Sequence, residues 1–123
     1  MAEWQKHCEL VTDGEQGVTD AFYLPCDSAR SYVVYESLFQ NTRVTGTLFV
    51  YVYQVCDTFE IVVERHGQPS ITRRITAGET NRSITLAVDC LEKITFRCLS
   101  ATPPTEGACY GYYSLQLQWC KCC

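Results

Sequence analysis

The sequence has few of the residues, and none of the motifs, on which most enzymes depend. It contains only two histidines, His7 and His66, and no nucleophile elbow, zincin motif, P-loop or dinucleotide fingerprint. A thiol hydrolase built on His7 and Cys8 would also need an orienting group and a pocket, for which the sequence gives no signal. We therefore expect a protein that is not an enzyme and that uses neither a cofactor nor a small-molecule substrate.

Long apolar runs and concentrated positive charge are missing as well. No run reaches the roughly 18 apolar residues of a membrane helix, and the Lys and Arg residues are scattered singly in a chain of net charge −4. Nucleic acids and anionic membranes bind basic stripes, so we expect neither as a partner. The N-terminus, MAEWQKHCEL, also lacks the charged and apolar regions of a secretory signal. An extracellular destination would require a signal already removed or another export route.

The 123 residues are instead dominated by alternating apolar and polar side chains. This period of two is typical of half-buried antiparallel strands. The clearest segments are TFEIVVER (58–65), SITLAVD (83–89), EKITFRC (92–98) and YSLQLQW (113–119). Turn signals separate them at 66–69, 77–80 and 101–107. The pattern predicts one all-β domain, a jelly-roll β-sandwich of about eight antiparallel strands.

Two segments carry apolar side chains on both faces. They are SYVVYESLF (31–39) and GTLFVYVYQVC (46–56). Strands of this kind are usually covered on both sides. Either a neighbouring subunit or a loop or N-terminal segment of the same chain could supply the second cover.

The composition divides the chain into three parts. Residues 1–20 are polar, contain Gly14 and Gly17 and show no alternation, which indicates an N-terminal connector arm. Residues 21–119 form the predicted sandwich body. Residues 120–123, with three cysteines, form a C-terminal tail.

Nine cysteines are the most unusual feature of the composition. In an oxidised protein an odd number leaves at least one thiol free or bonded to another chain. Cys122 and Cys123 are adjacent and cannot pair with each other without strain. We expect bonds between chains at Cys8, Cys26, Cys109, Cys120, Cys122 and Cys123. For Cys56, Cys90 and Cys98 we expect bonds within the subunit or a plain core position.

Zinc is the alternative use of these thiols. Cys120, Cys122 and Cys123 could bind it together with one of Cys8, Cys26 or Cys109. The paired two-residue spacing of structural zinc sites is absent, however, so no metal site is predicted.

The body resembles the subunits of bacterial endospore appendages, the fibres that project from Bacillus-type spores. The resemblance covers roughly residues 20–119 and rests on the Gly-Thr entry to the strand at 46–47, the AGET turn at 77–80, the DCLEKI corner at 89–94 and the Gly-Tyr-rich final strand. It implies a self-assembling subunit of an extracellular spore-surface fibre whose only partner is the protein itself. Subunits would associate by sheet augmentation, with each arm bonded by disulfides to its neighbours.

By the same resemblance Cys8 is the donor on the arm, with Cys26 and Cys109 as candidate acceptors. The chain departs from the family in two respects, because Cys8 stands alone in the arm and the CKCC tail is richer in cysteine. Two other functions remain open from the sequence. One is a secreted lectin-like binding module that uses Tyr110, Tyr112 and Tyr113, and the other is a spore-coat or virion shell protein.

Overall fold

The computed structural model of the chain describes residues 9–10, 16–26, 31–37, 43–100 and 107–121. It contains the strands β1 (Glu9–Leu10), β2 (Gln16–Pro25), β3 (Ser31–Glu36), β4 (Arg43–Gln54), β5 (Thr58–Arg65), β6 (Gln68–Thr76), β7 (Ser83–Val88), β8 (Leu91–Leu99) and β9 (Ala108–Lys121). None of the described residues belongs to a helix long and apolar enough to cross a membrane.

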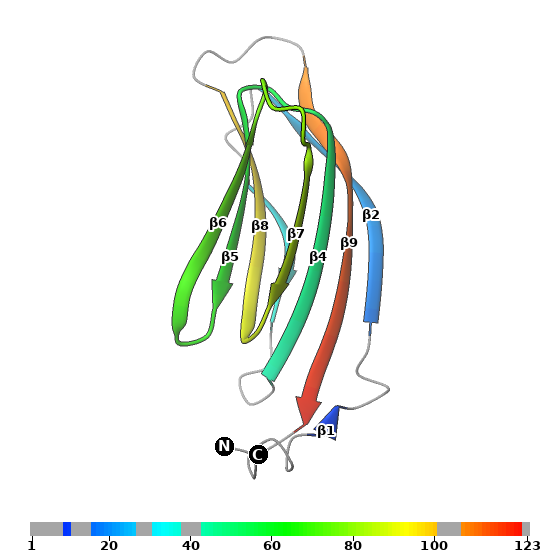
Figure 1. Cartoon of the computed structure of the whole chain (residues 1–123), viewed down its shortest axis with the longest axis vertical. Coiled ribbons are helices and arrows are strands. Elements are labelled where there is room, and N and C mark those ends of the chain that lie inside the picture. Colours follow the sequence, from blue (N-terminus) through cyan, green and yellow to red (C-terminus); the bar gives the residue numbers. More distant parts are fainter. Residues whose placement is uncertain (1–8, 11–15, 27–30, 38–42, 101–106, 122–123) are drawn as a thin grey trace.

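The strands form two sheets that lie face to face (Figure 1). The first sheet has the order β2–β9–β4–β7, with the short β1 also paired to β9. The second sheet has the order β3–β8–β5–β6. All pairings are antiparallel, and from β2 onward the chain alternates between the sheets except at the β5–β6 hairpin. This is a jelly-roll topology, which confirms the predicted fold class.

The hydrophobic core lies between the sheets and is built from the inward positions of the alternating strands. Its centre is a group of four rings from both sheets, Phe22, Phe59, Phe96 and Tyr113, with centroids 5.1–5.6 Å apart. Burial raises the pKa of the Tyr113 hydroxyl to about 12, with further contributions from Tyr32 and Asp20. The strands predicted from alternation therefore point their apolar sides inward as expected.

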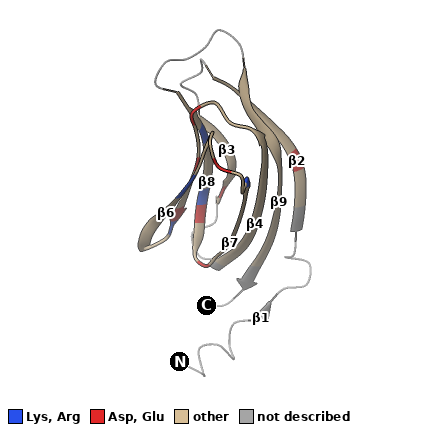
Figure 2. Cartoon of the chain, turned by 45° about the horizontal axis from the view of Figure 1, so that its top comes forward, with Lys and Arg blue, Asp and Glu red and all other residues tan. Residues whose placement is uncertain are grey.

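The two outer faces differ in chemistry (Figure 2). Charged side chains gather on the second sheet, where the buried carboxylate of Glu60 accepts hydrogen bonds from Arg74 Nε (2.7 Å) and Arg97 Nη1 (3.3 Å). The first sheet instead carries an aromatic ladder whose ring centroids lie 5.2–6.2 Å apart. The ladder consists of Tyr23, Phe49, Tyr51, Tyr53, Tyr110 and Tyr112.

Three side chains of this ladder belong to the segment at 46–56, which carries apolar side chains on both faces. Phe49 and Tyr51 are half-buried, and within the described chain the neighbouring rings of Tyr112 and Tyr53 contact them. Tyr53 at the edge of the ladder remains 57% exposed. The aromatic side chains therefore cover one another in part, and a cover from a neighbouring subunit stays a prediction.

The ends of the sandwich are set by β9, which runs the length of the first sheet (Figure 1). Cys109 is the second residue of β9 and Cys120 is its last but one. Cys120 lies eleven residue positions after Cys109, which in an extended strand is about 36 Å. We call these the Cys109 end and the Cys120 end of the sandwich. β1 lies at the Cys120 end, where Leu10 pairs with Cys120.

Candidate functional site: a four-cysteine cluster

Four cysteines converge at the Cys109 end. Cys26 is the first residue after β2, Cys56 lies in the connection from β4 to β5, and Cys98 and Cys109 lie on β8 and β9. Cys98 and Cys109 occupy inward positions of their strands, and the buried Cys26 continues the inward side of β2. Because β8 belongs to one sheet and β9 to the other, their inward residues face each other across the core.

The structure joins these cysteines in two disulfides, Cys26–Cys56 and Cys98–Cys109. In each bond the Cα atoms are 5.8 Å apart, within the usual range for a disulfide. Cys98–Cys109 joins the two sheets directly, and Cys26–Cys56 ties the end of β2 to the crossing from one sheet to the other. The cluster therefore closes the sandwich covalently at this end.

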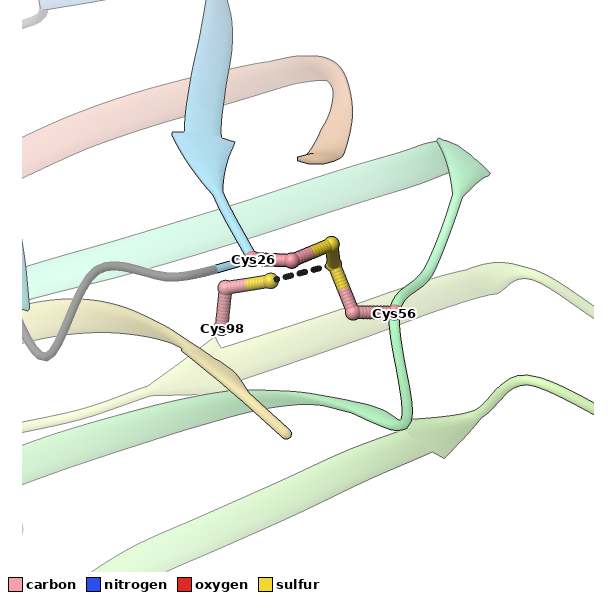
Figure 3. Close-up of side chains that lie close together, drawn as sticks. All are labelled: Cys26, Cys56 and Cys98. Atoms are coloured by element: carbon pink, nitrogen blue, oxygen red, sulfur yellow. Dashed lines mark hydrogen bonds between the residues drawn. A yellow bond between two sulfur atoms is a disulfide. The ribbon is translucent and has the colours of Figure 1, made fainter. Parts of the chain in front are cut away.

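The two disulfides are in contact with each other, and Figure 3 shows Cys98 beside the Cys26–Cys56 bond. Cys98 Sγ lies 3.3 Å from Cys56 Sγ, and the backbone N–H of Cys56 points to Cys109 Sγ at 3.4 Å. The backbone N–H of Cys26 donates to the carbonyl of Gly107 at 3.1 Å, which extends the β2–β9 ladder by one bond. All four sulfur atoms thus belong to one compact group.

Access to the cluster is uneven. Cys26 and Cys98 are each 4% exposed and Cys109 is fully buried, whereas Cys56 is half-buried. Gly107 is exposed and has a φ of 109°, a conformation that favours glycine. A Cβ at Gly107 would lie 3.4 Å from Cys26 Sγ and 3.8 Å from Gln54 Nε2, so a side chain at this position would crowd the sulfur.

The cluster also offers the only sulfur geometry in the described chain that suits a metal ion. The Sγ atoms of Cys26, Cys56 and Cys98 all lie within 4.8 Å of one another. As thiolates they could bind a soft cation, but in disulfides they have no thiolate to offer. The zinc alternative that combined the tail with Cys26 or Cys109 does not fit within one chain, because Cys120 lies at the other end of β9.

The remaining cysteines lie elsewhere. Cys90 is a half-buried free thiol between β7 and β8, at the Cys120 end, with a positive φ of 56°. Cys120 pairs through its backbone with Leu10 and Arg43. The predictions for Cys8, Cys122 and Cys123 fall outside the described residues.

Sequence reasoning did not foresee the partners within the cluster. It assigned Cys26 and Cys109 to bonds between chains, whereas the structure pairs both within the chain. The alternation of side chains along the strands could have shown that both cysteines point inward. Phe22 and Leu24 point inward, so the next position of the same parity, Cys26, does too. Cys109 likewise shares the inward parity of Tyr113, and inward cysteines of facing sheets are candidates to pair.

The lectin-like alternative is wrong in its choice of residues. Tyr113 is 4% exposed in the core, while Tyr110 and Tyr112 lie on the outer face of the first sheet. Adjacent positions of a strand point to opposite faces, so these three side chains do not converge on one site.

The chain was then compared with known proteins. Residues 6–120 match the family described as endospore appendages. A solved Bacillus structure from work describing endospore appendages as "a novel family of disulfide-linked pili" has a TM-score of 0.67 and 13% sequence identity. That match covers 92% of this chain and 89% of the other, and at this identity it shows a shared fold. No curated protein matches the sequence. Since the family match spans nearly the whole chain, the protein belongs to the endospore appendage family.

Proposed function

We propose that the protein is a structural subunit that polymerises into a disulfide-cross-linked, pilus-like fibre on the spore surface. The observation that carries the proposal is the placement of cysteine at both ends of an elongated sandwich. Four cysteines form the cluster at the Cys109 end, and Cys90 and Cys120 lie at the other. The family match supports the appendage, and no enzymatic role is proposed.

Unlike ends favour growth in one direction. A contact between two different surfaces is heterologous, and it extends into a helical filament when its rotation does not close a ring. Here the Cys120 end of one subunit would meet the Cys109 end of the next. The N-terminal arm predicted at residues 1–20 is shortened by β2, which begins at Gln16. The residues ahead of β2 would carry the Cys8 thiol across that junction, and the tail residues 120–123 would supply further thiols.

Sideways contact would use an exposed sheet edge. Natural edge strands are commonly protected by charged residues or proline. Among the edges of the two sheets, β1, β2, β3 and β6 each contain such a residue, but β7, with the sequence SITLAV, contains neither. We therefore propose β7 as the edge that pairs with a neighbouring subunit by sheet augmentation.

Electron microscopy of the purified protein, together with gels run with and without reductant, tests the fibre. We expect long fibres, and material that enters the gel as monomer only after strong reduction. A protein that remains a monomer under oxidising conditions would contradict the proposal.

The edge contact has its own test. Ala87→Lys places a charge on the exposed face of β7 and should reduce fibre formation while leaving the subunit folded. Ala77→Lys, in the exposed turn after β6, is the matched control and should form fibres normally. Equal fibre yields from the two variants would rule out β7 as the augmenting edge.

A further inference from the structure

We infer that the four-cysteine cluster is a thiol–disulfide relay that locks each cross-link after it forms. A thiolate from a second copy of the chain bonds to Cys26, Cys56 then bonds to Cys98, and the free thiol ends at Cys109. The inference rests on the proposed function, because a second copy supplies the attacking thiolate. The chemistry itself depends only on the described geometry of the cluster.

The first step takes place at the Cys26–Cys56 disulfide. This is the disulfide with a half-buried member, whereas both residues of Cys98–Cys109 are buried. Disulfide exchange requires that the attacking thiolate reach a sulfur atom. Cys26 Sγ lies beside Gly107, where a Cβ would come within 3.4 Å of the sulfur and 3.8 Å of Gln54 Nε2, so the approach to Cys26 runs between the Gly107 backbone and the Gln54 side chain. Attack there forms the new bond to Cys26 and releases Cys56 as a thiolate.

The second step follows from the contact between the disulfides. The released Cys56 Sγ already lies 3.3 Å from Cys98 Sγ. Attack on Cys98 forms Cys56–Cys98 and releases Cys109 as the leaving thiolate. No described residue separates these two sulfur atoms, so the step needs only a small movement of side chains.

The relay balances without an oxidant. One thiol and two disulfides enter, and two disulfides and one thiol remain. The proton lost by the incoming thiol is matched by the proton that Cys109 gains. No electrons leave the group, so a fibre could be cross-linked by this route with the oxidising equivalents that each folded subunit already holds.

The consequence is that the cross-link is protected from reversal. In a single exchange the Cys56 thiolate would remain beside the new bond at Cys26 and could attack it again. After the relay, Cys56 is bonded to Cys98, and the remaining thiol is at Cys109, which is fully buried and out of reach of an attacking group.

The test uses the purified full-length chain before assembly, with reduced glutathione as the attacking thiol. After brief incubation the remaining thiols are alkylated, and the disulfides are mapped by mass spectrometry. We expect glutathione on Cys26, a new Cys56–Cys98 bond and an alkylated Cys109. Glutathione on Cys56, an alkylated Cys56 beside an intact Cys98–Cys109 bond, or an unreactive cluster would each overturn the relay.

Variants separate the relay from simple exchange. In Cys98→Ser/Cys109→Ser the second step cannot occur, so glutathione on Cys26 should be lost again at least tenfold faster than in the unchanged protein. Cys90→Ser lies at the other end and should behave like the unchanged protein. Equal loss from both would contradict the lock, and if the double variant does not fold, the disulfide map of the unchanged protein still decides.

The relay and the fibre can fail independently. Reductant-sensitive fibres whose subunits retain Cys98–Cys109 would overturn the relay and leave the fibre intact. A glutathione-driven relay in a protein that never polymerises would overturn the fibre alone.

Discussion

The two ends of the sandwich hold their sulfur in different ways. At the Cys109 end four cysteines are joined in two disulfides that span both sheets. At the Cys120 end Cys90 is a free thiol. The last residues of β9 there are held by backbone pairing with β1 and β4. One end is covalently closed, while the other has a half-buried free thiol.

A chain with an odd number of cysteines can therefore stabilise one end with disulfides and keep a thiol at the other. A free thiol opposite a disulfide is a reactive pair, since exchange needs one of each.

Alanine substitutions at two glycines near opposite ends of the sandwich should differ most in their effect on the free energy of unfolding. A Cβ at Gly111, near the Cys109 end, would overlap the Tyr51 carbonyl oxygen and lie 2.9 Å from Val52 Cα, so Gly111→Ala requires the backbone to move. A Cβ at Gly46 would lie 2.7 Å from Leu91 Cδ2, a side-chain atom that can rotate away. In urea unfolding we expect Gly111→Ala to lose about 3 kcal/mol or more, and Gly46→Ala about 1 kcal/mol. Equal losses would contradict this account.

Removing cysteines should cost stability only at the Cys109 end. Cys26→Ser/Cys56→Ser opens a loop with a sequence separation of 30 residues, and the chain-entropy account gives a loss of about 3.6 kcal/mol in the free energy of unfolding. Cys90→Ser removes a thiol that forms no disulfide within the described chain. It should change the free energy of unfolding by less than about 0.5 kcal/mol. Urea unfolding under non-reducing conditions measures both. A large loss for Cys90→Ser would show that this thiol is bonded.

Alanine substitutions at Gly107 and Gly67 give a second comparison of the two ends, through both stability and the rate of glutathione addition. Both have positive φ, 109° and 65°, so an alanine at either should cost about 1–2 kcal/mol. Only at Gly107 does the new Cβ approach a sulfur, Cys26 Sγ, while Gly67 has open space around it. Gly107→Ala should therefore slow glutathione addition to Cys26 several-fold, whereas Gly67→Ala should leave the rate unchanged. Similar rates in both variants would exclude approach past Gly107.

The smallest effect concerns Tyr113, midway along β9. Its pKa is about 12 when folded and 10.0 when unfolded. The neutral hydroxyl therefore stabilises the fold fully below pH 10, and this contribution is lost as the pH rises from 10 to 12. At pH 11 the loss is about 1 kcal/mol. Tyr113→Phe should lose less stability than the unchanged protein between pH 9 and 11, and Tyr112→Phe, on the outer face, is the control. An identical pH dependence in Tyr113→Phe would refute the assignment.

Much of the fold could be predicted from the sequence because it depends on local alternation. The parity of Phe59 and Ile61, or of Phe96 and Cys98, places these side chains in the core without knowledge of their neighbours. The turns at 66–69 and 77–80 separate strands as their residues indicate. A period of two is a property of a single strand, and a single segment is enough to detect it.

The pairing of cysteines could not be predicted in the same way. Cys98 and Cys109 are close because β8 and β9 lie in different sheets on opposite sides of the core, which is a property of the topology. Parity could have shown that both point inward, but not that they meet. The buried Glu60 is similar. Its place on an outer face suggests solvation, yet Arg74 and Arg97 from the two flanking strands enclose it.

The length of β9 has a mechanical consequence. Its 14 residues run from one end of the sandwich to the other, with β4 bonded along one side and β2 along most of the other. Tension between subunits joined end to end would act parallel to this strand. Its hydrogen bonds lie across the strand direction, so they would bear the load together in shear instead of breaking one after another. The strand that separates the two reactive ends would also be the part of each subunit best suited to carry a pulling force.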